Sequence, residues 1–313
     1  MSSTLLASAG TRPDIHHEDA ATTFVTAVYE RRRDDVLGGR GLPMAWYLPS
    51  LASLVGMKAP LVIYTQARLV GGLSEFLIRE GANAQVIARP LSSVPRFWEI
   101  GELRVAQRVH TRAHRDRCHV LCHAKFAWLA EQARADPFRT ARVCWIDAGL
   151  SYPGLFPSRH LPRPHGRCAL FSPALAIGLA RTGAFTMFER SPLVGGQLHF
   201  VNVGAMQRIA GSDAEPIRTH VVGGVFGGRR DDVVKLYDEY DDVLAQMLGA
   251  GLLGTEENVL TIMYWRDRSR FAPQTFTTWY HEDTTFTQPA PHDVPFYRTF
   301  ERLAADDLLV HDR

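Results

Sequence analysis

Short apolar runs alternate with longer amphipathic segments through the first hundred residues of the chain. Thr22–Tyr29, Leu61–Thr65 and Ala84–Ala88 are rich in apolar and β-branched residues, which is typical of buried strands. Between them, Met44–Val55 and Val70–Glu80 carry apolar residues at helical spacing. This β-α-β-α-β order favours a parallel sheet with helices on its faces. We therefore expect an α/β fold with a mixed, mostly parallel central sheet.

The run Val143–Leu150, which reads Val-Cys-Trp-Ile-Asp-Ala-Gly-Leu, predicts the strand beside which a ligand binds. Its first four residues are apolar, and Pro137 ends the helical segment that precedes it. The run then stops at Asp147. A carboxylate at the carboxyl end of a buried strand stands where open α/β sheets bind their ligands. The alternative is an Asp that only caps the following turn.

Composition limits the class of protein. The chain has 313 residues, is 46% hydrophobic and carries a formal net charge of +2, which gives no electrostatic reason to expect a nucleic-acid partner. Its four cysteines do not make a disulfide scaffold. No signal peptide is evident, and no apolar run approaches the roughly 18 residues of a membrane span. We expect a cytoplasmic protein with a disordered leader, residues 1–20, and a single domain, residues 21–313.

A second informative stretch lies in the last third of the chain. Two glycine pairs, Gly223-Gly224 and Gly227-Gly228, bracket a short apolar strand, which indicates either close approach of a ligand or a bulge. A strongly amphipathic segment, Arg229–Leu248, predicts a long helix. The next helix is predicted to begin at Thr255 as its N-cap, followed by Glu256-Glu257. Capping accounts for one of these acids and leaves the other for function.

Other clusters have structural explanations as well as functional ones. The run Arg31–Arg33 is either a solvated loop or a basic clamp for a diphosphate. The stretch Cys118–His123 suggests zinc, but its Cys-x-x-x-Cys spacing and the lack of a second ligand pair disfavour that interpretation. Its cysteines are better explained as small core residues. The irregular segment Ser151–Arg167 is a long loop beside the expected site.

The order of these motifs resembles the HtrL/YibB-type bacterial proteins, glycosyltransferases of surface-polysaccharide synthesis. The resemblance is carried by the runs Trp145–Gly149, Gly223–Gly228 and Glu256–Leu260, with weaker patterns over roughly residues 22 to 285. The second half also resembles the α-1,3-galactosyl and blood-group transferases, in which an apolar-Phe-Gly-Gly strand precedes a long helix and an acid-Glu-x-x-Leu segment. Both resemblances imply the GT-A nucleotide-diphospho-sugar transferase fold.

The resemblance also implies roles for single residues. Asp147 matches the first Asp of the metal-binding Asp-x-Asp motif, whereas Gly149 stands at the second position. The motif therefore offers the expected Mn or Mg ion one carboxylate ligand instead of two. His281 is the candidate to complete the metal site. Glu257, with Glu256 beside it, is the candidate catalytic carboxylate, which would stabilise positive charge at the anomeric carbon or act as the nucleophile. The expected donor-binding residues are Thr26, Lys125, Asp147, Ala148, Gly149, Gly223, Gly224 and Gly227.

The expected function is transfer of a hexose from a nucleotide-diphosphate sugar, with UDP-sugars favoured, to a hydroxyl of a glycan or small molecule. The match to the galactosyltransferase group implies retention of the anomeric configuration. Such a reaction needs a carboxylate near the anomeric carbon and positive charge on the departing diphosphate. Two alternatives stay open: a sugar nucleotidyltransferase, and a non-catalytic protein that binds nucleotide-sugars.

Overall fold

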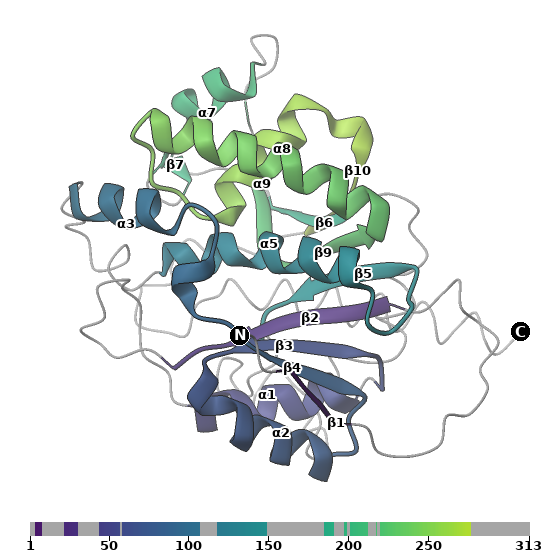
Figure 1. The fold of residues 1–313 in the computed structure, drawn as a ribbon. Coiled ribbons are helices and arrows are strands. Elements are labelled where there is room, and N and C mark those ends of the chain that lie inside the picture. The colour runs from purple at the N-terminus through teal and green to yellow at the C-terminus, as the bar shows by residue number, and fades with distance from the viewer. Residues whose placement is uncertain are drawn as a thin grey trace, which may run out of the picture.

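The computed structural model shows an α/β fold built on one large sheet, with helices packed against it (Figure 1). The residues that the structure describes are 4–7, 22–30, 44–56, 58–106, 118–148, 185–190, 197–198, 201–211, 217 and 220–276. Gly149, the loop Ser151–Arg167, the basic run Arg31–Arg33 and His281 lie outside them.

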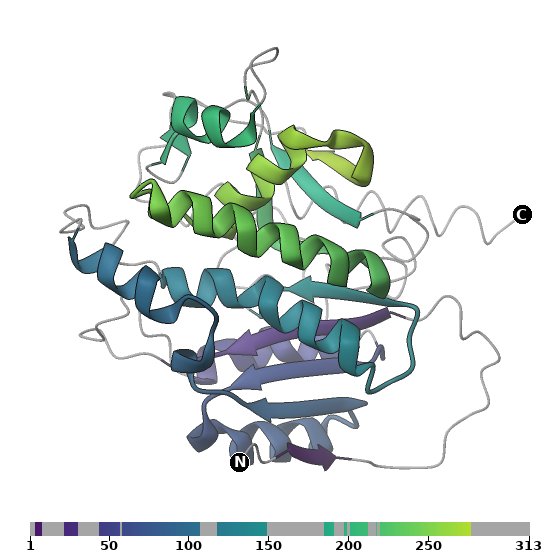
Figure 2. The same ribbon diagram turned by 45° about the horizontal axis from the view of Figure 1, so that its top comes forward.

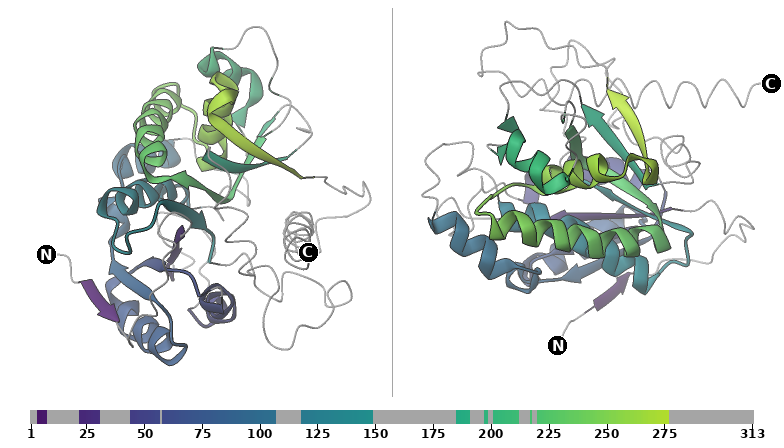
Figure 3. Two further views of the ribbon diagram at one scale, coloured as in Figure 1. Left: turned by 90° about the vertical axis from the view of Figure 1, so that its right-hand side faces the viewer. Right: turned by 90° about the horizontal axis from the view of Figure 1, so that it is seen from above.

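Among the described residues the large sheet has eight strands, and their order in the sheet differs from their order in the chain. From one edge to the other they are β1 (Thr4–Ala7), β4 (Ala84–Ala88), β3 (Leu61–Thr65), β2 (Thr22–Val28), β5 (Arg142–Ile146), β9 (His220–Arg229), β6 (Phe185–Arg190) and β10 (Phe271–Phe276). Six strands run in one direction, and β1 and β9 run against them. Figure 3 shows β10 at the edge of the sheet opposite β1. The expected mixed, mostly parallel sheet is confirmed.

Helices pack on both faces of this sheet. One face carries α1 (Met44–Gly56) and α2 (Val70–Arg79). The other carries α3 (Phe97–Ala106), α5 (His119–Ala135), α7 (Val203–Ala210), α8 (Arg230–Gly249) and α9 (Glu256–Arg266). Figure 2 shows α5 and α8 running side by side across this second face. None of the helices in the described ranges is long and apolar enough to cross a membrane.

The apolar strands supply core residues to both faces. Because side chains alternate along a strand, Phe24 and Cys144 pack with α1 and α2, whereas Val25, Val143 and Trp145 pack with α5 and α8. Full burial of one such large side chain contributes roughly 1.5–3 kcal/mol. A strand buried on both faces has no solvated position for a charged side chain, which explains why the middle of these runs carries no charge.

Some elements differ from the sequence expectations. Within the expected leader, Thr4–Ala7 form β1 and pair with β4. Two short strands, β7 (Gln197–Leu198) and β8 (Val201–Asn202), are followed at Val203 by α7, although Val201 and Val203 are β-branched residues of the kind that favour strands. Asn202 caps this helix by accepting a hydrogen bond from the Ala205 amide at 3.2 Å. The local capping chemistry therefore outweighs the β-branched residues.

Gly227 allows β9 to lie close to β5. It pairs with Cys144, and a Cβ at this position would lie 2.3 Å from the Val143 carbonyl oxygen and 2.6 Å from the Cys144 Cα. These are backbone atoms, which cannot turn away as a flexible side chain does. Close packing of two strands therefore requires glycine here.

We expect Gly227→Ala to lower the free energy of unfolding by about 3 kcal/mol, because the added methyl group overpacks two central strands. Gly101→Ala is the matched control: Gly101 lies inside α3, and outside its own helical turns no atom lies within 4 Å of the place that a Cβ would take. That change should leave stability unchanged or raise it by up to about 1 kcal/mol. Chemical denaturation of both variants measures the difference, and equal stabilities would contradict the packing role of Gly227.

Candidate functional site

Asp147 stands directly after β5, at the carboxyl end of the parallel strands. Its backbone amide donates a hydrogen bond to the Gly224 carbonyl at 2.9 Å, which continues the pairing of β5 with β9 by one residue. The side chain is 36% exposed, whereas Ala148 next to it is buried. The strand thus delivers a carboxylate to the edge of the sheet, as the sequence predicts.

Lys125 brings a buried positive charge to this carboxylate from the middle of α5. Its ammonium lies 2.8 Å from Asp147 Oδ1, 2.6 Å from Glu256 Oε1 and 3.2 Å from the Gly223 carbonyl. An ammonium has three N–H donors, and these acceptors use all of them. Burial opposes the charge, but the two carboxylates prevail and hold the pKa of Lys125 above its usual range.

Trp145 fixes Asp147 from another direction. Its indole Nε1–H donates to Asp147 Oδ1 at 2.7 Å, and the Lys125 ammonium lies 5.9 Å from the centre of the ring. Loss of hydration raises the pKa of Asp147 above its usual range, and Glu256 adds to the rise, while Lys125 acts against it. The Asp147 carboxylate is therefore held in one orientation by two donors.

The adjacent acids Glu256 and Glu257 begin α9 and face different surroundings. Glu256 is 3% exposed and reaches inward to Lys125. Glu257 is partly exposed, and its Oε1 accepts a hydrogen bond from the Gly223 amide at 3.0 Å. Residues one apart on a helix point about 100° away from each other, so the two acids cannot share one environment. Lys125, Asp147, Glu256 and Glu257 form what we call the acid–lysine cluster.

Gly223 is required by the packing of this cluster. A Cβ there would lie 2.3 Å from Glu256 Oε1 and 2.7 Å from its Cγ and Cδ. The Glu256 side chain thus occupies the space that any other residue would fill. The glycine-rich strand therefore serves the site by admitting a buried acid.

Two buried histidines of α5 hold the turn that leads into α9. His119 Nδ1 and His123 Nε2 lie 2.8 and 3.2 Å from the Gly254 carbonyl, and His123 Nδ1 lies 2.8 Å from the Tyr240 hydroxyl. A carbonyl only accepts, so each nitrogen facing it carries a proton, and Tyr240 donates to His123. These contacts explain the histidines beside Cys118 and Cys122 without a metal.

The structure brings together many of the predicted residues. Lys125, Asp147, Gly223, Gly224, Glu256 and Glu257 meet at one place, with Ala148 beside them. Thr26 is fully buried in β2, and its hydroxyl has no hydrogen-bond partner among the described residues. Gly227 lies three residues beyond Gly224 along β9, against Cys144. Gly149 and His281 lie outside the described ranges.

Sequence reasoning missed the contributions of Trp145, His119 and His123. The apolar pattern treats Trp145 only as a strand residue, although an indole two residues before a carboxylate on one strand shares its face and can donate to it. The i, i+4 spacing of His119 and His123 was the available signal for a shared partner on one helix face.

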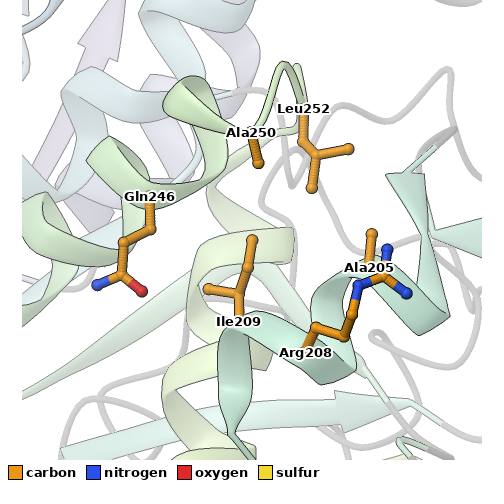
Figure 4. Close-up of a pocket in the computed structure, with 6 residues that line it drawn as sticks. All are labelled: Ala205, Arg208, Ile209, Gln246, Ala250 and Leu252. Atoms are coloured by element: carbon orange, nitrogen blue, oxygen red, sulfur yellow. The ribbon is translucent and has the colours of Figure 1, made fainter.

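Two surface pockets in the described part of the chain lie away from this cluster. One, of about 330 Å³, is lined by α7, the end of α8 and the following turn, and Figure 4 shows Arg208 and Gln246 at its rim. The other, of about 680 Å³, is lined by residues of α5 and by Arg89 and Tyr237. Neither includes Asp147 or Glu257. Grouped charge, not the depth of a hollow, identifies the candidate site.

No protein-family model and no curated protein matches this chain. Among solved structures, the apo form of mouse xyloside xylosyltransferase 1 aligns with 83% of this chain and 86% of its own, at 11% identity and a TM-score of 0.43. A 4-diphosphocytidyl-2C-methyl-D-erythritol synthase from Anaerococcus prevotii aligns with 91% of this chain and 97% of its own, at 8% identity and a TM-score of 0.41. At these values neither likeness says what this chain binds or catalyses.

We expect His123 to make stability depend on pH. Burial lowers its pKa from the usual 6.5 to about 4. Between these two pH values His123 is protonated in the unfolded chain but neutral in the folded protein. This contribution is fully present above pH 6.5 and is lost as the pH falls from about 6.5 to 4, by about 3 kcal/mol in total. The comparison to make is urea unfolding of wild type and His123→Gln at several pH values. A wild-type slope in this window that persists in His123→Gln would assign the effect to other groups.

Proposed function

We propose that this protein transfers a sugar, a hexose in the first instance, from a nucleotide-diphosphate donor to a hydroxyl acceptor. One observation carries the proposal: two solvent-reaching acids are anchored to adjacent glycines of β9, Asp147 to the Gly224 carbonyl and Glu257 to the Gly223 amide. Asp147 would lie on the side of the leaving diphosphate, and Glu257 would act at the sugar. Both stand at the carboxyl end of the parallel strands, where α/β sheets bind ligands.

The net charge of the acid–lysine cluster indicates how a diphosphate would be held. Three carboxylates and one ammonium sum to −2 when all are ionised, because −3 and +1 combine. A diphosphate is itself an anion, so it would be repelled from this place unless a cation lay between them. A hard divalent ion, Mn or Mg, prefers carboxylate and phosphate oxygens and supplies positive charge to the leaving group.

The residues present fit such an ion in part. Asp147 Oδ1 accepts from Trp145 at 2.7 Å and lies 2.8 Å from the Lys125 ammonium, while Oδ2 accepts from Lys125 at 3.0 Å and, among the described residues, keeps a lone pair for a metal. Within the described ranges no group of three His, Cys, Asp or Glu side chains is arranged so that it could hold a metal ion by itself. We propose Asp147 as one protein ligand of this ion and His281 as the second.

Glu257 is proposed to act at the sugar. Transfer passes through a state with positive charge at the anomeric carbon, which a nearby carboxylate stabilises or attacks. The Gly223 N–H, which donates to Glu257 Oε1 at 3.0 Å, orients this carboxylate. Attack by this carboxylate on the anomeric carbon would break the bond to the departing nucleoside diphosphate. The acceptor hydroxyl, with its proton released to water, would then displace the carboxylate, and the two displacements would give retention, the outcome that we propose. UDP-sugars are the donors to test first.

We expect Glu257→Gln to lower transfer by at least about 100-fold while donor affinity changes little, because an amide cannot stabilise the developing positive charge. Product formation from a panel of UDP-, GDP- and dTDP-sugars measures transfer, and calorimetry measures donor binding. Glu75→Gln, the same change at an exposed position of α2, is the control. Full transfer by Glu257→Gln would contradict a role for Glu257 at the sugar. Release of pyrophosphate when the protein is given a nucleoside triphosphate and a sugar phosphate would instead indicate a nucleotidyltransferase.

We also expect Mn to strengthen donor binding to wild type by tenfold or more, and Asp147→Asn to abolish that gain, because an amide oxygen carries no charge for the ion. Asp238→Asn, at a side chain of α8 that is 78% exposed, controls for general charge effects. Donor titrations with Mn and with chelator decide between outcomes. Equal affinities in both conditions would show that protein cations, not a metal, hold the diphosphate.

A further inference from the structure

We propose that Lys125 is a positioning residue, whose buried ammonium sets where Asp147 and Glu257 stand relative to each other. The inference rests on the proposed function, because it takes these two acids as the groups that meet the donor. Lys125 lies beneath them on α5 and touches Asp147 directly, whereas it reaches Glu257 through Glu256 and Gly223. Its effect on the reaction is therefore indirect.

The contacts of Lys125 join three elements that are distant in the sequence. Asp147 follows β5, Gly223 belongs to β9, and Glu256 starts α9. The same glycine that gives its carbonyl to Lys125 gives its amide to Glu257. One charge thus fixes the end of a strand, the adjoining strand and the first turn of a helix, and the two reacting acids belong to these parts.

The same geometry argues against direct contact between Lys125 and a donor. The side chain is 11% exposed, and its three N–H groups are used by Asp147, Glu256 and the Gly223 carbonyl. A phosphate oxygen would have to displace one of these buried acceptors, and the acceptor would then lose its partner. The expected role of Lys125 in donor binding is therefore replaced by a role in holding Asp147.

Glu256 completes the charge balance and explains why a buried ammonium is tolerated. Its 2.6 Å contact with Lys125 and its 3% exposure make it a partner inside the protein. Removing Lys125 alone leaves this carboxylate buried without a counter-charge, which destabilises a fold strongly. Removing both charges of the pair restores the balance but leaves Asp147 without its ammonium. The double change therefore separates folding from positioning.

Trp145 offers a reporter of Asp147 that does not depend on any activity. Its indole N–H donates to Asp147 at 2.7 Å, so its NMR frequency depends on where that carboxylate stands. The chain has six tryptophans, and Trp145→Phe identifies the indole signal that disappears. A shift or broadening of this signal marks a displaced Asp147.

The experiment compares Lys125→Met, Glu256→Gln and the double variant with Lys235→Met, the same change at an exposed lysine of α8. Melting temperature, the Trp145 indole signal, and kcat and KM for the donor are measured in each. We expect Lys125→Met to melt much lower and the double variant to regain most of that loss. We expect the double variant to keep a displaced indole signal and a kcat lowered about 100-fold, since small misplacement of reacting groups has effects of this size. Lys235→Met should match wild type.

Two results would overturn the proposal. An unchanged indole signal in the double variant would show that Asp147 stays in place without Lys125. Recovery of both stability and kcat would show that Lys125 only balances charge. The indole signal needs no substrate, so it tests positioning even when no nucleotide-sugar is turned over. A wild-type protein without transfer, but with an indole signal displaced by Lys125→Met, would reject the proposed function and keep Lys125 as the residue that holds Asp147.

Discussion

The contact of one buried ammonium with two carboxylates is the constraint on which the site depends. Taking Lys125 and Glu256 out of water is unfavourable by several kcal/mol for each ion, and only close, complete pairing, to which Asp147 contributes, offsets it. Pairing at 2.6–2.8 Å requires α5, β5 and α9 to be in register together. The ion pairs of the cluster therefore form only when the helices on the second face of the sheet are correctly packed.

The glycines of β9 follow from that condition. A glycine in a strand suggests either a ligand that approaches the backbone or a packing requirement, and here the two meanings separate by residue. Gly227 is needed because β5 lies against it, and Gly223 is needed because Glu256 lies against it. Gly223 also presents both its carbonyl and its amide to the acid–lysine cluster. Packing therefore explains why glycine is present at both positions, and at Gly223 the backbone carbonyl and amide also contact the acid–lysine cluster.

The sequence predicts the central strands well and the cluster only in part. Apolar runs bounded by turns locate β2, β3, β4 and β5 because both faces of these strands are buried, and no charged residue interrupts them. The strands β7 and β8 and the helix α7 are too short for periodicity to define. Resemblance singled out Asp147 and Glu257, with Lys125 and Glu256 among the other expected site residues. The contact of Lys125 with Glu256 joins residues 131 positions apart, and no local pattern encodes it.

The same charge count bears on Gly149, which stands where the Asp-x-Asp pattern has a second acid. The acid–lysine cluster already sets three carboxylates against one ammonium, a net charge of −2 that a single divalent ion, the cation proposed for the site, would neutralise. Glu256 already provides the additional carboxylate, from the start of α9 and on the buried side of Lys125. The proposed single ion would therefore balance the charge of the cluster without an acid at position 149. The glycine at the second position of the motif and the buried Lys125–Glu256 salt bridge therefore belong to the same charge balance.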